Sequence, residues 1–215
     1  MTIDPATVDA NLDRVRHRIG DAGGDPDAIT IVAVTKGFDA DAPRAAIAAG
    51  LTVLGENYAQ ELANKAAQVS GAEWHFIGRL QSNKVKLVAD AVTCWQSVDR
   101  SSLVGEIANR APGARILVQV NATGEGHKGG CPITDVRSLV EEAGGAGLVV
   151  EGLMTVGVDG DDRATRAGFE AVADLCSDLD LHVTSMGMTD DLELAVRAGT
   201  TMLRVGSALF GPRPA

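Results

Sequence analysis

Short apolar runs recur along the chain at fairly even intervals, and polar or Ala-rich segments separate them. The apolar runs have the length and composition of strands, and the segments between them have helical character. Strands are predicted at 29–34, 51–54, 74–77, 91–95, 115–120, 148–154, 182–186 and 202–205, with helices at 41–49, 58–69, 101–110 and 165–179 among others. The pattern therefore predicts that strand and helix alternate throughout.

Near-continuous apolar strands are typical of a parallel sheet that is covered on both faces. Eight strand–helix units within 215 residues fit an α/β fold of the (β/α)8 TIM barrel type, at the small end of its size range. A doubly wound open sheet is the alternative, and we favour the barrel. No Pro-, Ser- or charge-rich linker divides the chain, so one domain over residues 1–215 is expected.

The first twenty residues predict an extra N-terminal helix before the first strand. Leu12, Val15 and Ile19 recur at helical spacing, and the helix is expected to end near Gly23 and Gly24. This segment contains acids and an amphipathic pattern, and it lacks the basic start and apolar stretch of a signal peptide. No other segment approaches the length of a membrane span.

The charge balance limits the classes of partner. Asp and Glu number 29 against 19 Lys and Arg, for a formal net charge of -10. This excess argues against binding to nucleic acid or to an anionic membrane, both of which need basic surface. Cys94, Cys131 and Cys176 have neither zinc-site nor disulfide spacing, so we expect no metal and a reducing, cytoplasmic compartment.

Lys36 ends the first apolar run, which places an amine at the carboxyl end of the first strand, where barrel active sites are built. Apolar walls would disfavour its ammonium form, lower its pKa and free the nitrogen lone pair for attack on an aldehyde. A lone lysine in this position is more often a solvated residue that closes a strand. The hypothesis that Lys36 holds a carbonyl cofactor therefore depends on its neighbours.

Arg204 interrupts what should be a buried last strand, and an unpaired buried guanidinium would cost several kcal/mol. Strand alternation puts it on one face with Met202 and Gly206, directed toward the barrel mouth. An ion pair with a nearby carboxylate is the alternative. Gly206 and Ser207 follow at the start of a short helical turn, where amides and a hydroxyl could cradle a phosphate.

Polar residues at two other strand ends are further candidates. Ser185 ends the seventh predicted strand, and barrels often bind phosphate after strands seven and eight. Asn57 follows the second strand and could bond a ring substituent while Glu56 balances a charge, although a turn and helix cap explains them equally well. His75 is interpreted as a core histidine, and Thr189 as a helix N-cap.

The Gly-rich segment after the fifth strand contains a G-x-G-x-x-G match at Gly124, Gly126 and Gly129. The match is weak, because glycines and a proline follow before a helix can begin, and we interpret the segment as an active-site loop. Lys128 precedes Gly129 and so makes no P-loop. A nucleotide-binding protein is the alternative that this segment leaves open.

Five motifs follow one another along the chain. They are Val-Ala-Val-Thr-Lys36, Gly-Glu-Asn57-Tyr-Ala-Gln-Glu, Trp-His75-Phe-Ile-Gly-Arg-Leu-Gln-Ser-Asn-Lys, Ser185-Met-Gly-Met-Thr-Asp-Asp and Arg204-Val-Gly-Ser-Ala-Leu-Phe-Gly. Together and in this order they resemble the pyridoxal phosphate homeostasis protein family. The resemblance implies a barrel similar to the N-terminal domain of alanine racemase, with pyridoxal 5′-phosphate (PLP) held as a Schiff base on Lys36.

The resemblance also implies roles for individual residues. The phosphate region maps onto Ser185, Gly206 and Ser207. Arg204 would lie near the pyridine nitrogen, keep it unprotonated and weaken the ring as an electron sink. Thr35, Gly37 and Tyr58 depart from the residues usual in the family, and Lys128 is a second lysine that could accept the cofactor transiently.

These implications give a non-catalytic, cytoplasmic and monomeric protein that stores PLP or delivers it to PLP-dependent apo-enzymes by transient contact. The alternative is a racemase-like enzyme, which needs an acid/base group on each face of the substrate. Tyr58 is the only tyrosine in the chain, and the sequence leaves no room for the second β domain from which such racemases recruit theirs.

Overall fold

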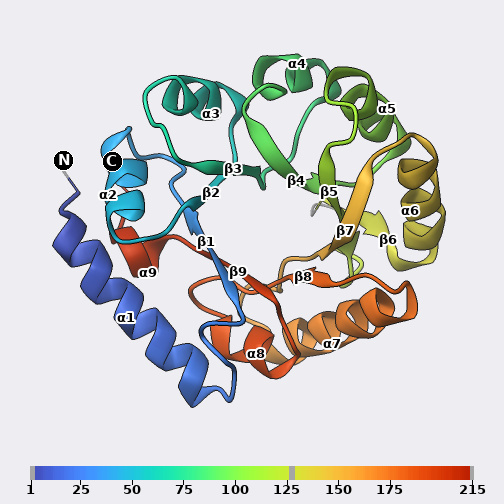
Figure 1. Ribbon diagram of the computed structural model, residues 1–215. Coiled ribbons are helices and arrows are strands. Elements are labelled where there is room, and N and C mark those ends of the chain that lie inside the picture. The colour runs from blue at the N-terminus through green and yellow to red at the C-terminus, as the bar shows by residue number, and fades with distance from the viewer. Residues whose placement is uncertain (1–2, 126–128, 214–215) are drawn as a thin grey trace.

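The computed structural model of the chain describes residues 3–125 and 129–213. Eight parallel strands close into a ring in the order β1-β2-β3-β4-β5-β7-β8-β9, and β9 pairs again with β1 (Figure 1). The predicted barrel is therefore confirmed, and the alternative of an open sheet is excluded. The ring strands are β1 Thr30–Val34, β2 Val53–Glu56, β3 Glu73–Phe76, β4 Val92–Val98, β5 Arg115–Asn121, β7 Val149–Met154, β8 Val183–Ser185 and β9 Met202–Val205.

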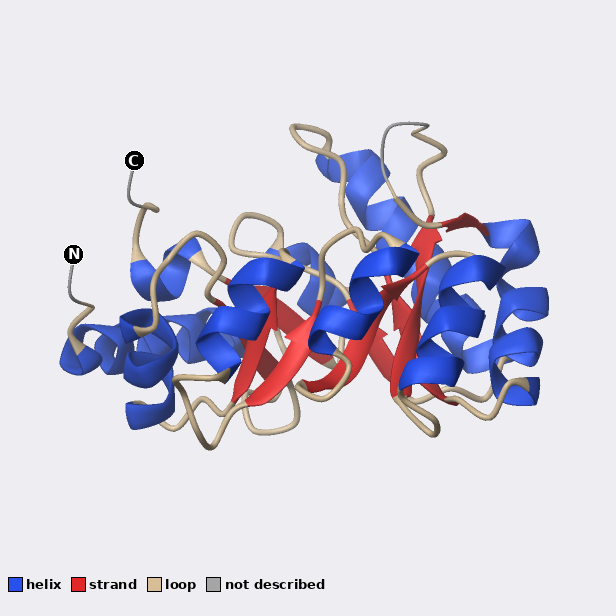
Figure 2. Ribbon diagram, turned by 90° about the horizontal axis from the view of Figure 1, so that it is seen from above, coloured by secondary structure: helices blue, strands red, loops and turns tan. Residues whose placement is uncertain are grey.

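Helices surround the ring and cover its outer face, as the side view in Figure 2 also shows. Each lies between two consecutive ring strands, apart from the N-terminal and C-terminal helices. They are α2 Asp41–Ala48, α3 Ala59–Ala66, a short 3-10 turn Ser82–Lys84 leading into α4 Val85–Val88, α5 Ser101–Arg110, a 3-10 turn Ile133–Asp135 leading into α6 Val136–Gly145, α7 Asp162–Asp178, α8 Leu192–Arg197 and α9 Ser207–Phe210.

The expected N-terminal helix is present as α1, Pro5–Asp21. Asp4 caps it by accepting a hydrogen bond from Ala6 N, and Pro5 occupies the first turn, where its missing N–H costs nothing. Val8, Leu12, Val15 and Ile19 are buried, and the helix packs across α2, α8 and α9. It covers helices near the point where the first and last strands meet (Figure 1).

One strand was not expected from the sequence. β6, Cys131–Pro132, pairs with Val120 and Asn121 at the end of β5, outside the ring. Two residues are too few to give a periodic pattern, and Pro132 argues against a strand in any sequence reading. Gly130 just before β6 has a φ of 115° and packs against Asn121 N, so no other residue fits there without a shift.

The core has two parts, one on each side of the barrel wall. A large cluster fills the space between strands and helices, and a small one fills the barrel interior with Val32, Cys94, Leu117, Met154 and Met202. The ring strands also bury the polar side chains of His75, Gln96, Ser185 and Arg204. Within the described residues, no helix has the length and apolar character needed to cross a bilayer.

Candidate functional site

A cavity of about 530 Å³ opens at the carboxyl ends of the strands, which is the face where barrel sites are built. Loops after β1, β2, β3, β7, β8 and β9 contribute to it, together with the segment after α9. It is lined by Val34, Lys36, Phe38, Asn57, Ile77, Val156, Met188, Thr189, Asp190, Arg204, Gly206, Ser207, Gly211, Pro212 and Arg213. Its volume suits a small organic ligand.

Lys36 lies in this cavity two residues after the end of β1 and is half-buried. Its amine forms no hydrogen bond or ion pair with residues 3–125 or 129–213. Burial lowers the pKa of Lys36, and the positive charges of Arg213 and Arg204 lower it further, against an opposing effect of Glu56. An unpaired amine with a lowered pKa is more often neutral, and so more nucleophilic, than a solvated lysine.

Arg204 lines the same cavity from β9 although only 4% of its surface is exposed. Its Nη1 donates to the carbonyl oxygen of Ser185 at 2.7 Å and to Ser185 Oγ at 2.8 Å, and its Nη2 donates to the carbonyl oxygen of Thr155 at 2.7 Å. Burial lowers the pKa of Arg204 to about 10, while Asp191 opposes that change. Hydrogen bonds to neutral acceptors, not the ion pair considered from sequence, therefore fix the guanidinium.

A chain of polar side chains continues from Arg204 across the barrel interior. Ser185 Oγ donates to Gln96 Oε1 at 2.7 Å, and Gln96 Nε2 lies 2.7 Å from His75 Nδ1. Because Gln96 Nε2 is a donor, His75 Nδ1 accepts and the neutral ring carries its proton on Nε2. His75 is thus a core histidine, as the sequence suggested, with Nε2 buried and without a partner in the described residues.

The residues expected to bind phosphate occupy different depths. Gly206 and Ser207 line the cavity at the start of α9. Ser185 is fully buried beneath Arg204, its hydroxyl is engaged on both sides, and it is not among the residues that line the cavity. Thr189 lines the cavity instead, with its Oγ1 3.1 Å from Ser207 Oγ and 3.4 Å from Ala208 N. Ser185 therefore holds the Arg204 guanidinium in place by accepting its hydrogen bond.

The N-cap role expected of Thr189 is wrong. Helix α8 begins at Leu192, and the residue at its N-cap position is Asp191. Asp191 Oδ1 accepts from Met188 N at 2.5 Å, which closes the loop over the strand end and leaves the Thr189 hydroxyl directed at Ser207. A threonine before two acids is a good cap in isolation, but the loop geometry moves the helix start by two residues.

Asn57 lines the cavity after β2, and its Oδ1 is buried and has no hydrogen-bond partner among the described residues. A buried free acceptor of this kind fits a ligand that carries a hydroxyl or other donor. Glu56, one residue earlier, is fully buried and points away from the cavity into a network behind β1. The charge that it balances belongs to Lys65, not to a ligand.

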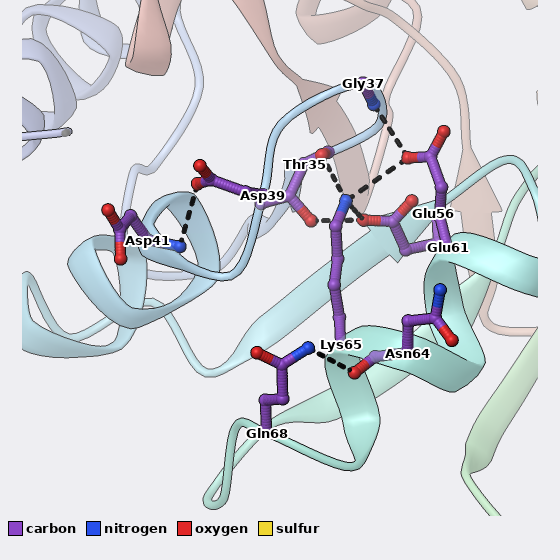
Figure 3. A network of polar contacts seen from close by, with 9 residues as sticks. All are labelled: Thr35, Gly37, Asp39, Asp41, Glu56, Glu61, Asn64, Lys65 and Gln68. Carbon is purple, nitrogen blue, oxygen red and sulfur yellow. Dashed lines mark hydrogen bonds and ion pairs between the residues drawn. The ribbon is translucent and has the colours of Figure 1, made fainter. Parts of the chain in front are cut away.

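Lys65 is the centre of this network (Figure 3). Its ammonium donates to Glu56 Oε1 at 2.6 Å, to the carbonyl oxygen of Thr35 at 2.7 Å and to Glu61 Oε2 at 3.3 Å. Thr35 Oγ1 also donates to Glu56 Oε1, at 2.6 Å. Burial raises the pKa of Glu56, while the charge and hydrogen bond of Lys65 act in the opposite direction.

Glu61 extends the network to the other side of Lys36. Its Oε2 accepts from Gly37 N at 2.8 Å while it also faces Lys65, as Figure 3 shows. Gly37 has a φ of 76°, a conformation that glycine adopts without strain. The peptides before and after Lys36 are therefore both held by side chains of α3, so the backbone that carries the amine is fixed from behind.

The sequence did not identify Lys65, Glu61 or Arg213 as parts of the site. Lys65 is one turn from the buried Leu62 on α3, so a lysine on the apolar stripe of a helix was the available signal. Arg213 comes close to Lys36 only because the chain after α9 returns to the cavity. Lys128, the candidate second acceptor, and Gly126 lie outside the described residues.

Comparisons with known proteins agree on one family. Residues 3–214 match the family model described as alanine racemase, N-terminal domain. The pyridoxal phosphate homeostasis protein of Pseudomonas aeruginosa is 38% identical over 222 residues, covering 97% of this chain and 96% of that protein. Its counterpart in Escherichia coli is 34% identical, covering 94% of this chain and 95% of that protein.

Among solved structures, PipY of Synechococcus elongatus, which contains bound PLP, superposes with a TM-score of 0.80 at 28% identity, covering 92% of this chain and 100% of that one. Relatives above 30% identity over nearly the whole length, together with the family model, agree with the five ordered motifs. The chain therefore belongs to the pyridoxal phosphate homeostasis protein family.

Proposed function

We propose that the protein binds pyridoxal 5′-phosphate through a Schiff base on Lys36 and takes part in intracellular vitamin B6 homeostasis. The observation that carries this proposal is the half-buried, unpaired Lys36 amine with a lowered pKa, facing a cavity of about 530 Å³. The amine would add to the aldehyde carbon of the cofactor, and water would leave. The PLP-bound structure of PipY supports the choice of ligand.

The other polar groups of the cavity fit the rest of such a ligand. Ser207 and Thr189 offer hydroxyls and Gly206 offers close backbone approach, which suits a phosphate group. The free Oδ1 of Asn57 suits a hydroxyl on the ring. Ser185, which the sequence nominated for the phosphate, contributes in our proposal by holding Arg204 in place.

A role without strong catalysis fits the charge that faces the ring. PLP acts as an electron sink when its pyridine nitrogen is protonated, and the fixed positive charge of Arg204 opposes that protonation. Tyr58, the candidate acid/base of a racemase, is 56% exposed and is not among the described residues that line this cavity. These two observations favour a carrier over a racemase-like enzyme.

We propose that the protein stores PLP as a protected aldehyde and passes it to PLP-dependent apo-enzymes during transient contacts in the cytoplasm, acting as a monomer. The names of the relatives support a homeostatic role. A cavity that is open at the strand ends, with its amine half-exposed, suits reversible loading.

The test is spectroscopic. Protein incubated with PLP and desalted should show the visible absorption of a Schiff base, and borohydride reduction should add the mass of one reduced cofactor to the peptide that contains Lys36. Lys36→Ala should lose both signals, while Lys86→Ala, at an exposed lysine outside the cavity, should keep them. Cofactor found on another lysine of the wild-type protein would reject the site.

Catalysis is tested separately. Racemase and transaminase assays with amino acids should show no robust turnover by the loaded protein, whereas an apo-enzyme mixed with it should regain activity. Efficient turnover by the isolated chain would overturn the carrier role while leaving the cofactor site intact.

A further inference from the structure

A second cavity, of about 640 Å³, lies on the same face of the barrel, beside the first. It is built from the loop after β2 with the start of α3, the end of β3 with the loop after it and α4, and Arg100, two residues after the end of β4. Asn57 is the one described residue that lines both cavities, and we call it the partition between them. The other lining residues are Tyr58, Ala59, Gln60, Phe76, Arg79, Leu80, Gln81, Lys84, Leu87 and Arg100.

The charged side chains that line the second cavity are positive, although the whole chain is negatively charged. Its lining contains Arg79, Lys84 and Arg100 and no carboxylate, in a protein with a formal net charge of -10. Arg100 is paired with Asp99 at 2.5 Å. The side chains of Arg79 and Lys84 make no ion pair or hydrogen bond within the described parts of the chain. Two free cations in a concave site favour an anionic ligand.

The walls of the second cavity are preorganised. Arg100 Nη2 donates to the carbonyl oxygen of Leu80 at 2.7 Å, and Ser97 Oγ donates to the carbonyl oxygen of Gly78 at 2.5 Å. Gly78 in turn packs directly under the partition, because a Cβ there would overlap Asn57 O and lie 2.6 Å from Asn57 Cα. The loop that carries Arg79 is therefore held at both ends, so little ordering would be needed on binding.

Tyr58 adds an apolar, planar surface at this cavity. This residue is 56% exposed, although few large hydrophobic residues are exposed in the described parts of the chain. A tyrosine ring can stack on a flat heteroaromatic ring, and the neighbouring cations can bind the phosphate that such a ring carries. The volume of the cavity falls in the range for small molecules, whereas a docked protein would need a much larger surface.

We propose that this cavity is a second, noncovalent site for a phosphate monoester of a flat aromatic ring, the chemical class of the cofactor itself. Arg79 and Lys84 bind the phosphate, and Tyr58 stacks on the ring. The inference rests on the proposed function for its choice of ligand and extends that function. A cofactor in the second cavity would be bound noncovalently, and Asn57 would separate it from the cavity that contains Lys36. Loading and release would then pass through two neighbouring sites.

The experiment first closes the Lys36 site. Protein loaded with PLP is reduced with borohydride, and mass spectrometry verifies one cofactor on Lys36. The reduced protein is then titrated calorimetrically with pyridoxine 5′-phosphate, which has no aldehyde, and in separate arms with pyridoxine and with inorganic phosphate. We expect saturable binding of one equivalent of pyridoxine 5′-phosphate and weaker binding of both fragments.

The variant pair tests the location. Arg79→Gln with Lys84→Gln should weaken this binding about tenfold or more, since two charged contacts are lost. Lys86→Gln with Arg137→Gln removes the same charge from exposed residues outside both cavities and should stay close to wild type. Thermal melting midpoints verify that both double variants fold. If the Arg79→Gln, Lys84→Gln double variant does not fold, each of its two substitutions is tested singly.

Each failure has its own signature. If the reduced wild-type protein takes up no pyridoxine 5′-phosphate, or if both variant pairs lose affinity equally, the second site is refuted while the cofactor on Lys36 remains. Inorganic phosphate binding as tightly as the ester would refute the ring contact with Tyr58. If reduction adds no mass at Lys36, the proposed function fails first, and the same titration on Lys36→Ala decides the second site alone.

Discussion

The ammonium of Lys65 donates a hydrogen bond to the carbonyl oxygen of Thr35 at 2.7 Å, one peptide before Lys36. Lys65 is 4% exposed and, among the described residues, is not part of the cavity lining. It also neutralises the buried Glu56, which bonds Thr35 through a second contact. A charge pair inside the wall of the barrel thus fixes the strand end that carries the reactive amine.

Lys65→Met should therefore destabilise the fold strongly. Removing one partner of a buried ion pair leaves Glu56 without its cation, at a typical cost of about 3–5 kcal/mol in unfolding free energy. Urea denaturation measures this loss. The double variant Lys65→Met with Glu56→Gln should recover part of it, because no charge is then left alone, and a single variant that loses under about 1 kcal/mol would contradict the pairing.

Glu61 allows a milder test of how α3 holds the backbone next to Lys36. Glu61→Ala removes the acceptor of Gly37 N, whereas Glu61→Gln keeps an oxygen at that position. We expect the alanine variant to release cofactor faster from Lys36 and the glutamine variant to stay near wild type, as followed by visible absorption after dilution. Glu106→Ala, at a surface ion pair on α5, is the control. Equal release from all three variants would show that the Gly37 contact does not position Lys36.

Gly78 should tolerate no side chain. A Cβ at this position overlaps the backbone of Asn57, so Gly78→Ala must move the loop after β2 and should cost about 1–3 kcal/mol. Gly105 on α5 has nothing within 4 Å, and Gly105→Ala should stabilise the protein by roughly 0.5–1 kcal/mol through helix propensity. Thermal and urea unfolding compare the two. Similar effects of the two changes would remove the argument that Asn57 is held by contact with Gly78.

The barrel was predictable because most of its strands appear in the sequence as short, largely apolar runs, a pattern that does not depend on distant contacts. Lys36 and Arg204 were predictable because strand ends meet at one face of a barrel and because a charge inside a buried strand needs a reason. The depth of Ser185 was not predictable. Its position at a strand end is visible in the sequence, but its engagement by Gln96 and Arg204 depends on residues far along the chain.

Lys65 shows a different limit. Helix α3 was expected over residues 58–69, and the helix is present from Ala59 to Ala66. A lysine on a predicted helix is ordinarily solvated, and only the packing of α3 against the ends of β1 and β2 brings Lys65 to Glu56 and to the carbonyl of Thr35. Contacts of this kind are set by tertiary structure, and no local pattern encodes the distance.

His75 should make the protein sensitive to acid. Burial, with a smaller effect from Arg115, lowers its pKa to about 4, and its Nδ1 already accepts from Gln96. An unfolded histidine titrates near 6.5, so between about pH 6.5 and 4 the unfolded state binds the proton more strongly and stability falls as the pH falls. The contribution is fully present above about pH 6.5 and is lost toward pH 4, with about 2 kcal/mol gone by pH 5.

Urea unfolding of wild type and His75→Gln at pH 7.5 and pH 5 isolates this group, because the other titrating residues cancel in the difference. The wild-type protein should lose about 2 kcal/mol more than the variant between the two pH values. His182→Gln, at an exposed position, controls for the loss of a histidine elsewhere. Parallel losses in wild type and His75→Gln would mean that His75 is protonated in the folded protein, and the polar chain from His75 to Arg204 would then need a different proton arrangement.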